Sequence, residues 1–195
     1  NEECYSCLRH LLETDGPIKD LVTDLQQISP WRPLPRVNVN CFDTRIDLGS
    51  QRSDGSANCL FPKNPRIEIN PHTHSTCDSM SGTFLEELLH AYDCITSEQD
   101  LSNPSPLTPR CIGHKCSEMR ACMARPDRCV GFPSCEAKIE CCIQHVVKNY
   151  GVCDDLDSTK STLRRCGDLR VAPPAPLVST PPSLVLPCQW TINER

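Results

Sequence analysis

TFLEELLHAYDC, residues 83–94, is the stretch of the sequence that decides the fold. It differs at one position from H-E-x-x-H, a helical motif in which two histidines one turn apart bind zinc and the glutamate acts as a general base. Glu87 and His90 occupy the positions of the base and of the second histidine, and Glu86 replaces the first histidine. Apolar residues at helical spacing predict a helix from about Ser81 to Ile95.

Cysteine is unusually frequent in this chain. Sixteen of the 195 residues are cysteines, which is near the level of a disulfide scaffold and typical of an oxidising compartment. Cys4 and Cys7 form a C-x-x-C pair, but no second pair lies at zinc-ribbon spacing, so we expect each to bridge to another segment. The length and composition predict one disulfide-rich domain over residues 1–170 and a proline-rich extended tail over residues 171–195.

The charge and hydropathy of the chain restrict the classes of partner. The net charge is −5 at pH 7, and no long basic run is present, so nucleic acid is not expected as a partner. No apolar run approaches the roughly 20 residues that span a bilayer. We therefore expect a protein that contacts a membrane at most peripherally.

Strands are predicted upstream of the motif helix, and helices dominate downstream of it. Alternation of apolar and polar residues predicts strands over 36–40 and 66–70, whereas the polar stretch 43–58 is predicted to be a loop. Ser79 or Ser81 is the expected cap of the motif helix. The fold class is thus α+β, mostly helical with a small sheet. Further helices are predicted in two pieces over 4–28, from near 114 to 124, over 134–149 and over 157–166.

A second motif, CSEMRA, occupies residues 116–121. The two motifs, in this order and at this distance, resemble the mitochondrial inner-membrane metalloprotease family that processes and assembles an ATP synthase subunit. The similarity extends over roughly residues 3–170. It implies a zincin-like fold, in which an edge strand just before the active helix holds the substrate backbone. Residues 66–70 occupy the position of this edge strand in the sequence.

The resemblance also implies a role for each polar residue of the two motifs. His90 would ligate zinc, and Glu118 would be a third ligand from the next helix. Glu87 would take a proton from the bound water. Asp93, one turn beyond His90, would orient a ligand, and Arg120 would pair with a carboxylate of the site or form a structural salt bridge.

The departure from the family pattern lies at Glu86. A carboxylate can ligate zinc. With Glu86, Glu87 and Glu118, however, the site would hold several negative charges around the single imidazole of His90. Such a set of ligands is harder and suits magnesium or calcium better than catalytic zinc. We therefore expect these residues to cluster as a degenerate site in which Glu87 has lost its catalytic setting and a tetrahedral zinc is absent.

A third motif competes with this interpretation. Cys141, Cys142 and His145 match the C-C-x-x-H pattern of secreted phospholipases A2. In those enzymes an aspartate follows the histidine, whereas Val146 follows it here, and no glycine-rich calcium loop precedes the pattern. We interpret both cysteines as bridge-formers and His145 as a residue of the helix surface.

These observations favour a catalytically impaired relative of the metalloprotease family. It would lie in the mitochondrial intermembrane space, peripheral to the inner membrane, as a structural or assembly subunit of the respiratory chain or ATP synthase. One alternative is an active zinc metalloendopeptidase of the same space that processes an ATP synthase subunit. Another is a secreted disulfide-rich binding protein with accidental motif similarity.

Overall fold

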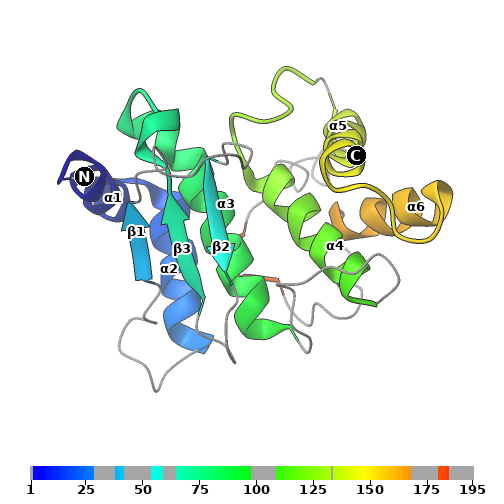
Figure 1. Cartoon of the computed structure of the whole chain (residues 1–195), viewed down its shortest axis with the longest axis horizontal. Helices are drawn as coiled ribbons and strands as arrows, with labels where there is room; N and C mark the ends of the chain where they lie inside the picture. Colours follow the sequence, from blue (N-terminus) through cyan, green and yellow to red (C-terminus); the bar gives the residue numbers. More distant parts are fainter. Residues whose placement is uncertain are drawn as a thin grey trace, which may run out of the picture. The chain divides into compact units, whose positions relative to one another are not determined.

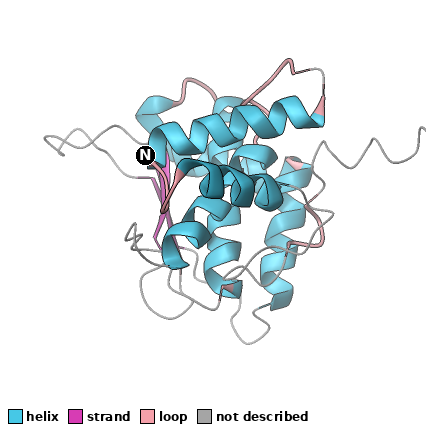
Figure 2. Cartoon of the chain, turned by 90° about the vertical axis from the view of Figure 1, so that its right-hand side faces the viewer, coloured by secondary structure: helices cyan, strands magenta, loops and turns pink. Residues whose placement is uncertain are grey.

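The computed structural model describes residues 2–28, 38–41, 54–58, 65–97, 109–132, 134–167 and 180–184. The chain forms two compact units, residues 1–95 and 96–195. Among the described residues, six α-helices and a three-stranded sheet account for most of the secondary structure (Figure 2). The predicted α+β class, mostly helical with a small sheet, is confirmed.

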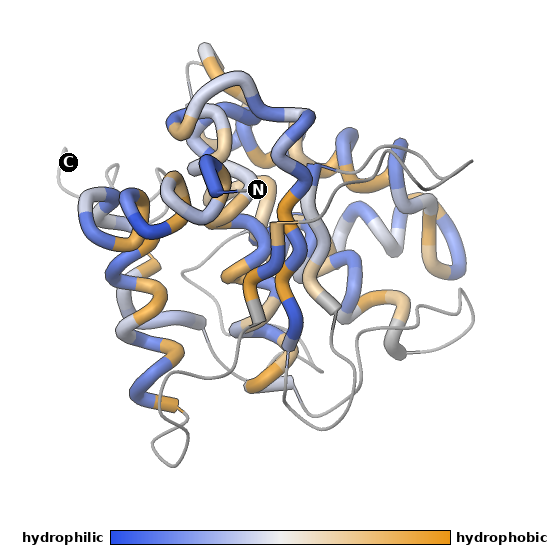
Figure 3. Tube along the Cα trace, turned by 60° about the vertical axis from the view of Figure 1, so that its left-hand side comes forward, coloured by the Kyte–Doolittle hydropathy of each residue, from blue (hydrophilic) through white to orange (hydrophobic). Residues whose placement is uncertain are grey.

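The first unit begins with a pair of helices, α1 (Glu2–Thr14) and α2 (Gly16–Ile28), which pack against each other. Asp15 separates them, and its carboxylate accepts a hydrogen bond of 3.2 Å from the backbone N–H of Ile18. Such a bond satisfies one of the N–H groups that a helix start leaves without a partner. The predicted two-piece helix is therefore confirmed, and its buried apolar residues recur every three or four positions. Along the described trace as a whole, hydrophobic and hydrophilic stretches are interspersed (Figure 3).

The sheet contains β1 (Asn38–Cys41), β2 (Gly55–Asn58) and β3 (Arg66–Ile69). Its order is β1-β3-β2, with β3 parallel to β1 and antiparallel to β2 (Figure 1). The prediction of a loop over 43–58 is wrong at β2. The sequence GSAN contains no β-branched or aromatic residue, so its strand conformation depends on pairing with β3 and not on local preference.

The expectation that residues 66–70 form an edge strand is also wrong. β3 is the central strand, and Ile67 and Ile69 are fully buried. Among the described residues, β1 and β2 form the two edges of the sheet. The backbone N–H of Cys41 in β1 donates a hydrogen bond of 3.3 Å to the hydroxyl of Tyr5 in α1, which covers this part of one edge.

The motif helix is α3 (Cys77–Thr96), which begins earlier than predicted. Its start is capped by Thr76: the Thr76 hydroxyl accepts from the N–H of Ser79, and the Ser79 hydroxyl accepts from the N–H of Thr76. This reciprocal pair is a capping box made with serine. The expected cap at Ser79 or Ser81 is therefore wrong. Ser81 instead donates a hydrogen bond of 2.5 Å to the carboxylate of Asp15.

The second unit consists of α4 (Pro109–Ala124), α5 (Cys135–Tyr150) and α6 (Leu156–Gly167), each packed against the other two. Helix α4 begins five residues before the predicted start at 114, and a proline at the first helical position suits that start. Leu184, in a described piece of the tail, packs against the core of these helices. The rest of the predicted extended tail lies outside the described residues.

Disulfides connect elements within each of the two units. Every cysteine among the described residues is disulfide-bonded, so the predicted oxidised framework is confirmed for this part of the chain. Cys4 and Cys7 bridge to other segments, as expected. The bridges with both partners described are Cys4–Cys41, Cys7–Cys77, Cys111–Cys153, Cys116–Cys166, Cys122–Cys142 and Cys129–Cys141.

A short polar network closes the turn between α4 and α5. The buried guanidinium of Arg125 donates from Nε to Asp127 Oδ1 at 2.9 Å and pairs with the second carboxylate oxygen through Nη2. Lys138 donates to the carbonyl of Arg125 at 3.3 Å. The hydrogen bond from Arg125 lowers the pKa of Asp127 below the ordinary value of 3.8, whereas burial lowers the pKa of Lys138 below its usual range.

Asp127 is expected to make the stability of this unit depend on pH. Because the pKa of Asp127 is lower in the folded protein, its contribution is complete above pH 3.8 and is lost as pH falls through the folded-state pKa. Substitution Asp127→Asn should lower the free energy of unfolding near neutral pH and have no effect in strong acid. Urea unfolding of both proteins across this range measures the difference. A difference that persists unchanged in strong acid would contradict the assignment.

Candidate functional site

Helix α3 places Glu86 and His90 on one face, because residues four apart are neighbours on a helix surface. A carboxylate oxygen of Glu86 and a ring nitrogen of His90 lie within 4.8 Å of each other. Glu86 is 6% exposed, whereas His90 is half-buried. The predicted pairing of these two residues is therefore present within the first unit, and both can contact one cation.

Glu87 contacts the sheet at Gly55, in the edge strand β2. A Cβ atom built on Gly55 would lie 3.1 Å from both Cγ and Oε1 of Glu87, and 2.8 Å from Cγ2 of Thr83. The absence of a side chain at Gly55 is what allows this approach. The candidate base therefore lies against an edge strand, but the strand is β2, which the sequence pattern did not reveal.

Asp93 lies three residues beyond His90 and is fully buried. A carboxylate without contact to water is costly unless it accepts hydrogen bonds or pairs with a charge. Its position on α3 agrees with the predicted role in support of His90, one helical turn away. That role remains a prediction.

Glu118 and Arg120 belong to α4, in the second unit. Glu118 is 9% exposed and Arg120 is fully buried. His114 Nε2 lies 3.6 Å from Glu118 Oε1, one turn away on the same helix, and the His114 ring contacts the Tyr150 ring edge-on with centroids 5.6 Å apart. A helical glutamate–histidine pair at a spacing of four residues thus lies on α3 in the first unit and on α4 in the second.

Lys115 is a buried cation beside the second pair. Its ammonium group donates a hydrogen bond of 2.9 Å to the carbonyl of Tyr150, at the last residue of α5. Burial lowers the pKa of Lys115, and the nearby charge of Glu118 acts in the opposite direction. The contact with the end of α5 assigns this lysine a capping role in the second unit.

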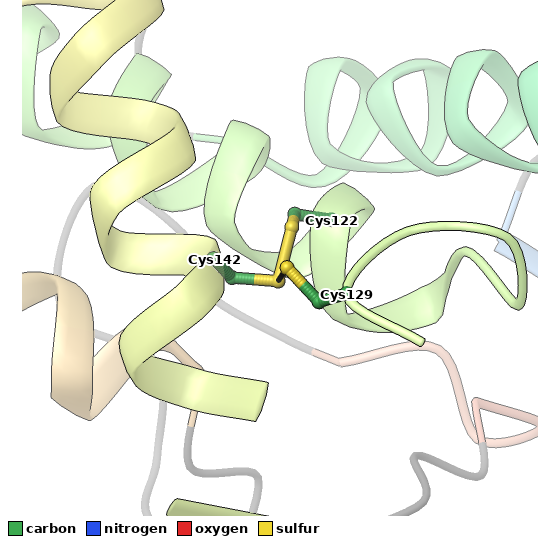
Figure 4. A group of neighbouring side chains, drawn as sticks. All are labelled: Cys122, Cys129 and Cys142. Atoms are coloured by element: carbon green, nitrogen blue, oxygen red, sulfur yellow. Dashed lines mark hydrogen bonds between the residues drawn. A yellow bond between two sulfur atoms is a disulfide. The ribbon is translucent and has the colours of Figure 1, made fainter. Parts of the chain in front are cut away.

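A group of three cysteine sulfurs also has the spacing of a metal site. The Sγ atoms of Cys122, Cys129 and Cys142 lie within 4.8 Å of one another (Figure 4). Cys122 is bonded to Cys142, however, and Cys129 to Cys141. Disulfide sulfurs are not thiolates, and a thiolate is the form that binds metal. This cluster is therefore structural.

The phospholipase-like pattern has a structural explanation as well. Cys141 and Cys142 both form bridges, as the sequence interpretation expected. The guanidinium of Arg128 contacts Nε2 of His145, and the Asn149 amide donates to the His145 carbonyl at 2.9 Å. A guanidinium can only donate hydrogen bonds, so it occupies the nitrogen lone pair that a general base would use.

Glu86 and His90 offer one carboxylate and one imidazole where the zinc motif offers two imidazoles. Catalytic zinc sites supply three protein ligands, commonly with two or more histidines. The described first unit brings one imidazole and one carboxylate together at this face of α3. This set has one neutral histidine ligand instead of the two of the family motif, and a charged oxygen ligand favours harder cations.

Comparisons with known proteins add no relative: no family model, no curated protein sequence and no solved structure matches this chain. In the described part of the chain, no helix combines the length and apolar character that crossing a bilayer requires.

The close approach of Gly55 to α3 can be tested by substitution. Gly55→Ala should lower the free energy of unfolding by about 1–3 kcal/mol, because the added methyl group overlaps Thr83 and Glu87. Gly16→Ala is the matched control in the same unit, since no atom lies within 4 Å of a Cβ built there. Denaturant unfolding of both variants measures the effect. Equal stability of the two variants would exclude the contact.

Proposed function

We propose that this protein is a catalytically impaired metalloprotease-like protein that acts as a structural or assembly subunit of a mitochondrial inner-membrane complex. The proposal rests on the resemblance of the segments at 83–94 and 116–121 to a protease family that already works on such a complex. The host would be the respiratory chain or ATP synthase, and the protein would lie in the intermembrane space, peripheral to the inner membrane.

The observation that carries the loss of activity is the Glu86–His90 pair. The helix, the spacing and the approach of the two side chains are those of a metal-binding pair, yet one member is a carboxylate. If Glu118 approaches this pair, as the family resemblance predicts, the site holds one imidazole between two carboxylates, with Glu87 as a third acidic neighbour. Anionic ligands donate charge to a metal and weaken its ability to acidify bound water.

The oxidised cysteines support the proposed compartment. The described cysteines are all bonded, and such a framework needs an oxidising environment. The intermembrane space has its own machinery for disulfide formation. β2 beside Glu87, an outer strand of the sheet in the described part of the chain, supports a binding role, because a strand at the edge of a sheet is able to pair with an extended segment of a partner.

A second candidate is an active zinc metalloendopeptidase of the intermembrane space that processes an ATP synthase subunit. The approach of Glu86 to His90 within 4.8 Å favours it, since both side chains can reach the same ion. In this case Glu86 would be an unusual zinc ligand and Glu87 the base. Metal content separates the two candidates.

Restoration of the family motif should restore zinc binding. Glu86→His replaces a charged ligand with a neutral imidazole and should raise zinc affinity by about tenfold or more. The added substitution His90→Ala should remove this gain. Competition with a chromogenic chelator measures the affinity, and Glu13→His, on the exposed surface of α1, is the control for an added histidine. One tightly bound zinc per native chain, dependent on His90 and accompanied by peptide cleavage, would overturn the impaired-enzyme proposal.

The assembly role predicts that the protein stays in a large complex without catalysis. On native gels of detergent-solubilised mitochondria, the chain should migrate far above its own mass of 21.8 kDa. The Glu87→Gln variant should migrate in the same way, because the proposed role needs no general base. Migration of the native chain as a monomer, or loss of the complex in Glu87→Gln alone, would contradict the role.

A further inference from the structure

An apolar groove of about 490 Å³ opens in the first unit, where α1 runs beside β1 and α3. Leu8 and Phe84 line it and are 4% and 1% exposed. Tyr5 and Leu12 line it from α1 and remain 40% and 37% exposed, and Val39 of β1 also lines it. A concave surface lined mainly by apolar side chains is typical of a binding site.

Two disulfides hold the elements around this groove in place. Cys4–Cys41 ties α1 to β1, and Cys7–Cys77 ties α1 to the first residue of α3. A groove whose elements are linked covalently loses little conformational freedom when it is filled. It is therefore preorganised for a ligand, and its opening does not require a change in the fold.

The pattern on α1 indicates the kind of ligand. Tyr5, Leu8 and Leu12 follow one another at spacings of three and four residues, which is the spacing of the apolar seam between two packed helices. Glu2 and Arg9, which also line the groove, lie seven residues apart and therefore at equivalent positions beside that seam. In helix pairs these flanking positions carry the charges that select the partner.

The two charges distinguish a helix from a lipid. A fatty acid offers one anionic head group, which Arg9 would attract, but it offers nothing to Glu2. A helix seven or more residues long can present a basic residue to Glu2 and an acidic residue to Arg9 on the same side. Within α1, the Arg9 side chain donates through Nε to the Tyr5 carbonyl at 3.4 Å, and the two Nη groups of a guanidinium are further donors suited to a carboxylate.

We propose that this groove binds an amphipathic helix of a partner protein, with apolar residues between Tyr5, Leu12 and Val39 and opposite charges facing Glu2 and Arg9. The inference gives the proposed assembly role a contact surface. It does not depend on the metal chemistry at His90, so the peptide experiment and the zinc experiment can succeed or fail separately.

Three synthetic helical peptides of three heptads test the proposal on the full chain. All carry leucine at each seam position, and they differ in the two flanking residues, which are lysine and glutamate, two lysines or two glutamates. The native protein should bind the mixed peptide about fivefold to tenfold more tightly than either like-charged peptide. Arg9→Glu should shift the preference to the two-lysine peptide, and Glu2→Lys to the two-glutamate peptide. Fluorescence anisotropy measures the affinities.

The apolar part of the groove is tested with a matched pair of substitutions. Leu12→Gln should weaken binding of the mixed peptide by about tenfold. Ile28→Gln, on α2 and 36% exposed, should leave it unchanged, and near-ultraviolet circular dichroism checks that both variants are folded. No binding of any peptide, binding that ignores the charge variants, or equal losses in the two glutamine variants would overturn the proposal. Leu12-dependent binding of laurate without peptide binding would assign the groove to a lipid instead.

Discussion

The rest of the structure depends on the burial of three carboxylates on one helix. Glu86, Glu87 and Asp93 of α3 are each at most 6% exposed. Removal of an ionised carboxylate from water costs several kcal/mol unless partners compensate for the lost hydration. The fold must therefore keep α3 in a fixed position relative to those partners. Three contacts fix the N-terminal part of α3. They are the capping box, the Ser81–Asp15 hydrogen bond and the Cys7–Cys77 bridge.

The sequence pattern predicts α3 itself but not the elements around it. The helix was predictable because a long apolar periodicity determines it. Strand β2 was not, because GSAN has no strand preference of its own and becomes a strand only by pairing with β3. The central place of β3 follows from that pairing and was missed with it. The cap at Thr76 was missed because serine at the third helical position replaces the usual glutamate or glutamine of a capping box.

Sequence reasoning about the site succeeded where helix geometry alone decides the outcome. The spacing of four residues brings Glu86 to His90, and the same spacing would have revealed the contact of His114 with Glu118. The approach of Gly55 to Glu87 depends on residues far apart in the sequence, and no local pattern encodes it.

The bridges in the second unit have a consequence for the way in which the chain matures. Cys141 and Cys142 are adjacent in sequence but bond to different partners, Cys129 and Cys122. The sulfurs of Cys142 and Cys129 lie 3.8 Å apart although they are not bonded. A thiolate formed at either bridge would therefore stand beside the sulfur of the other, in position for exchange. The choice between the two possible partners of Cys142 therefore depends on sub-ångström to ångström differences in sulfur position, which the packing of α4 against α5 fixes.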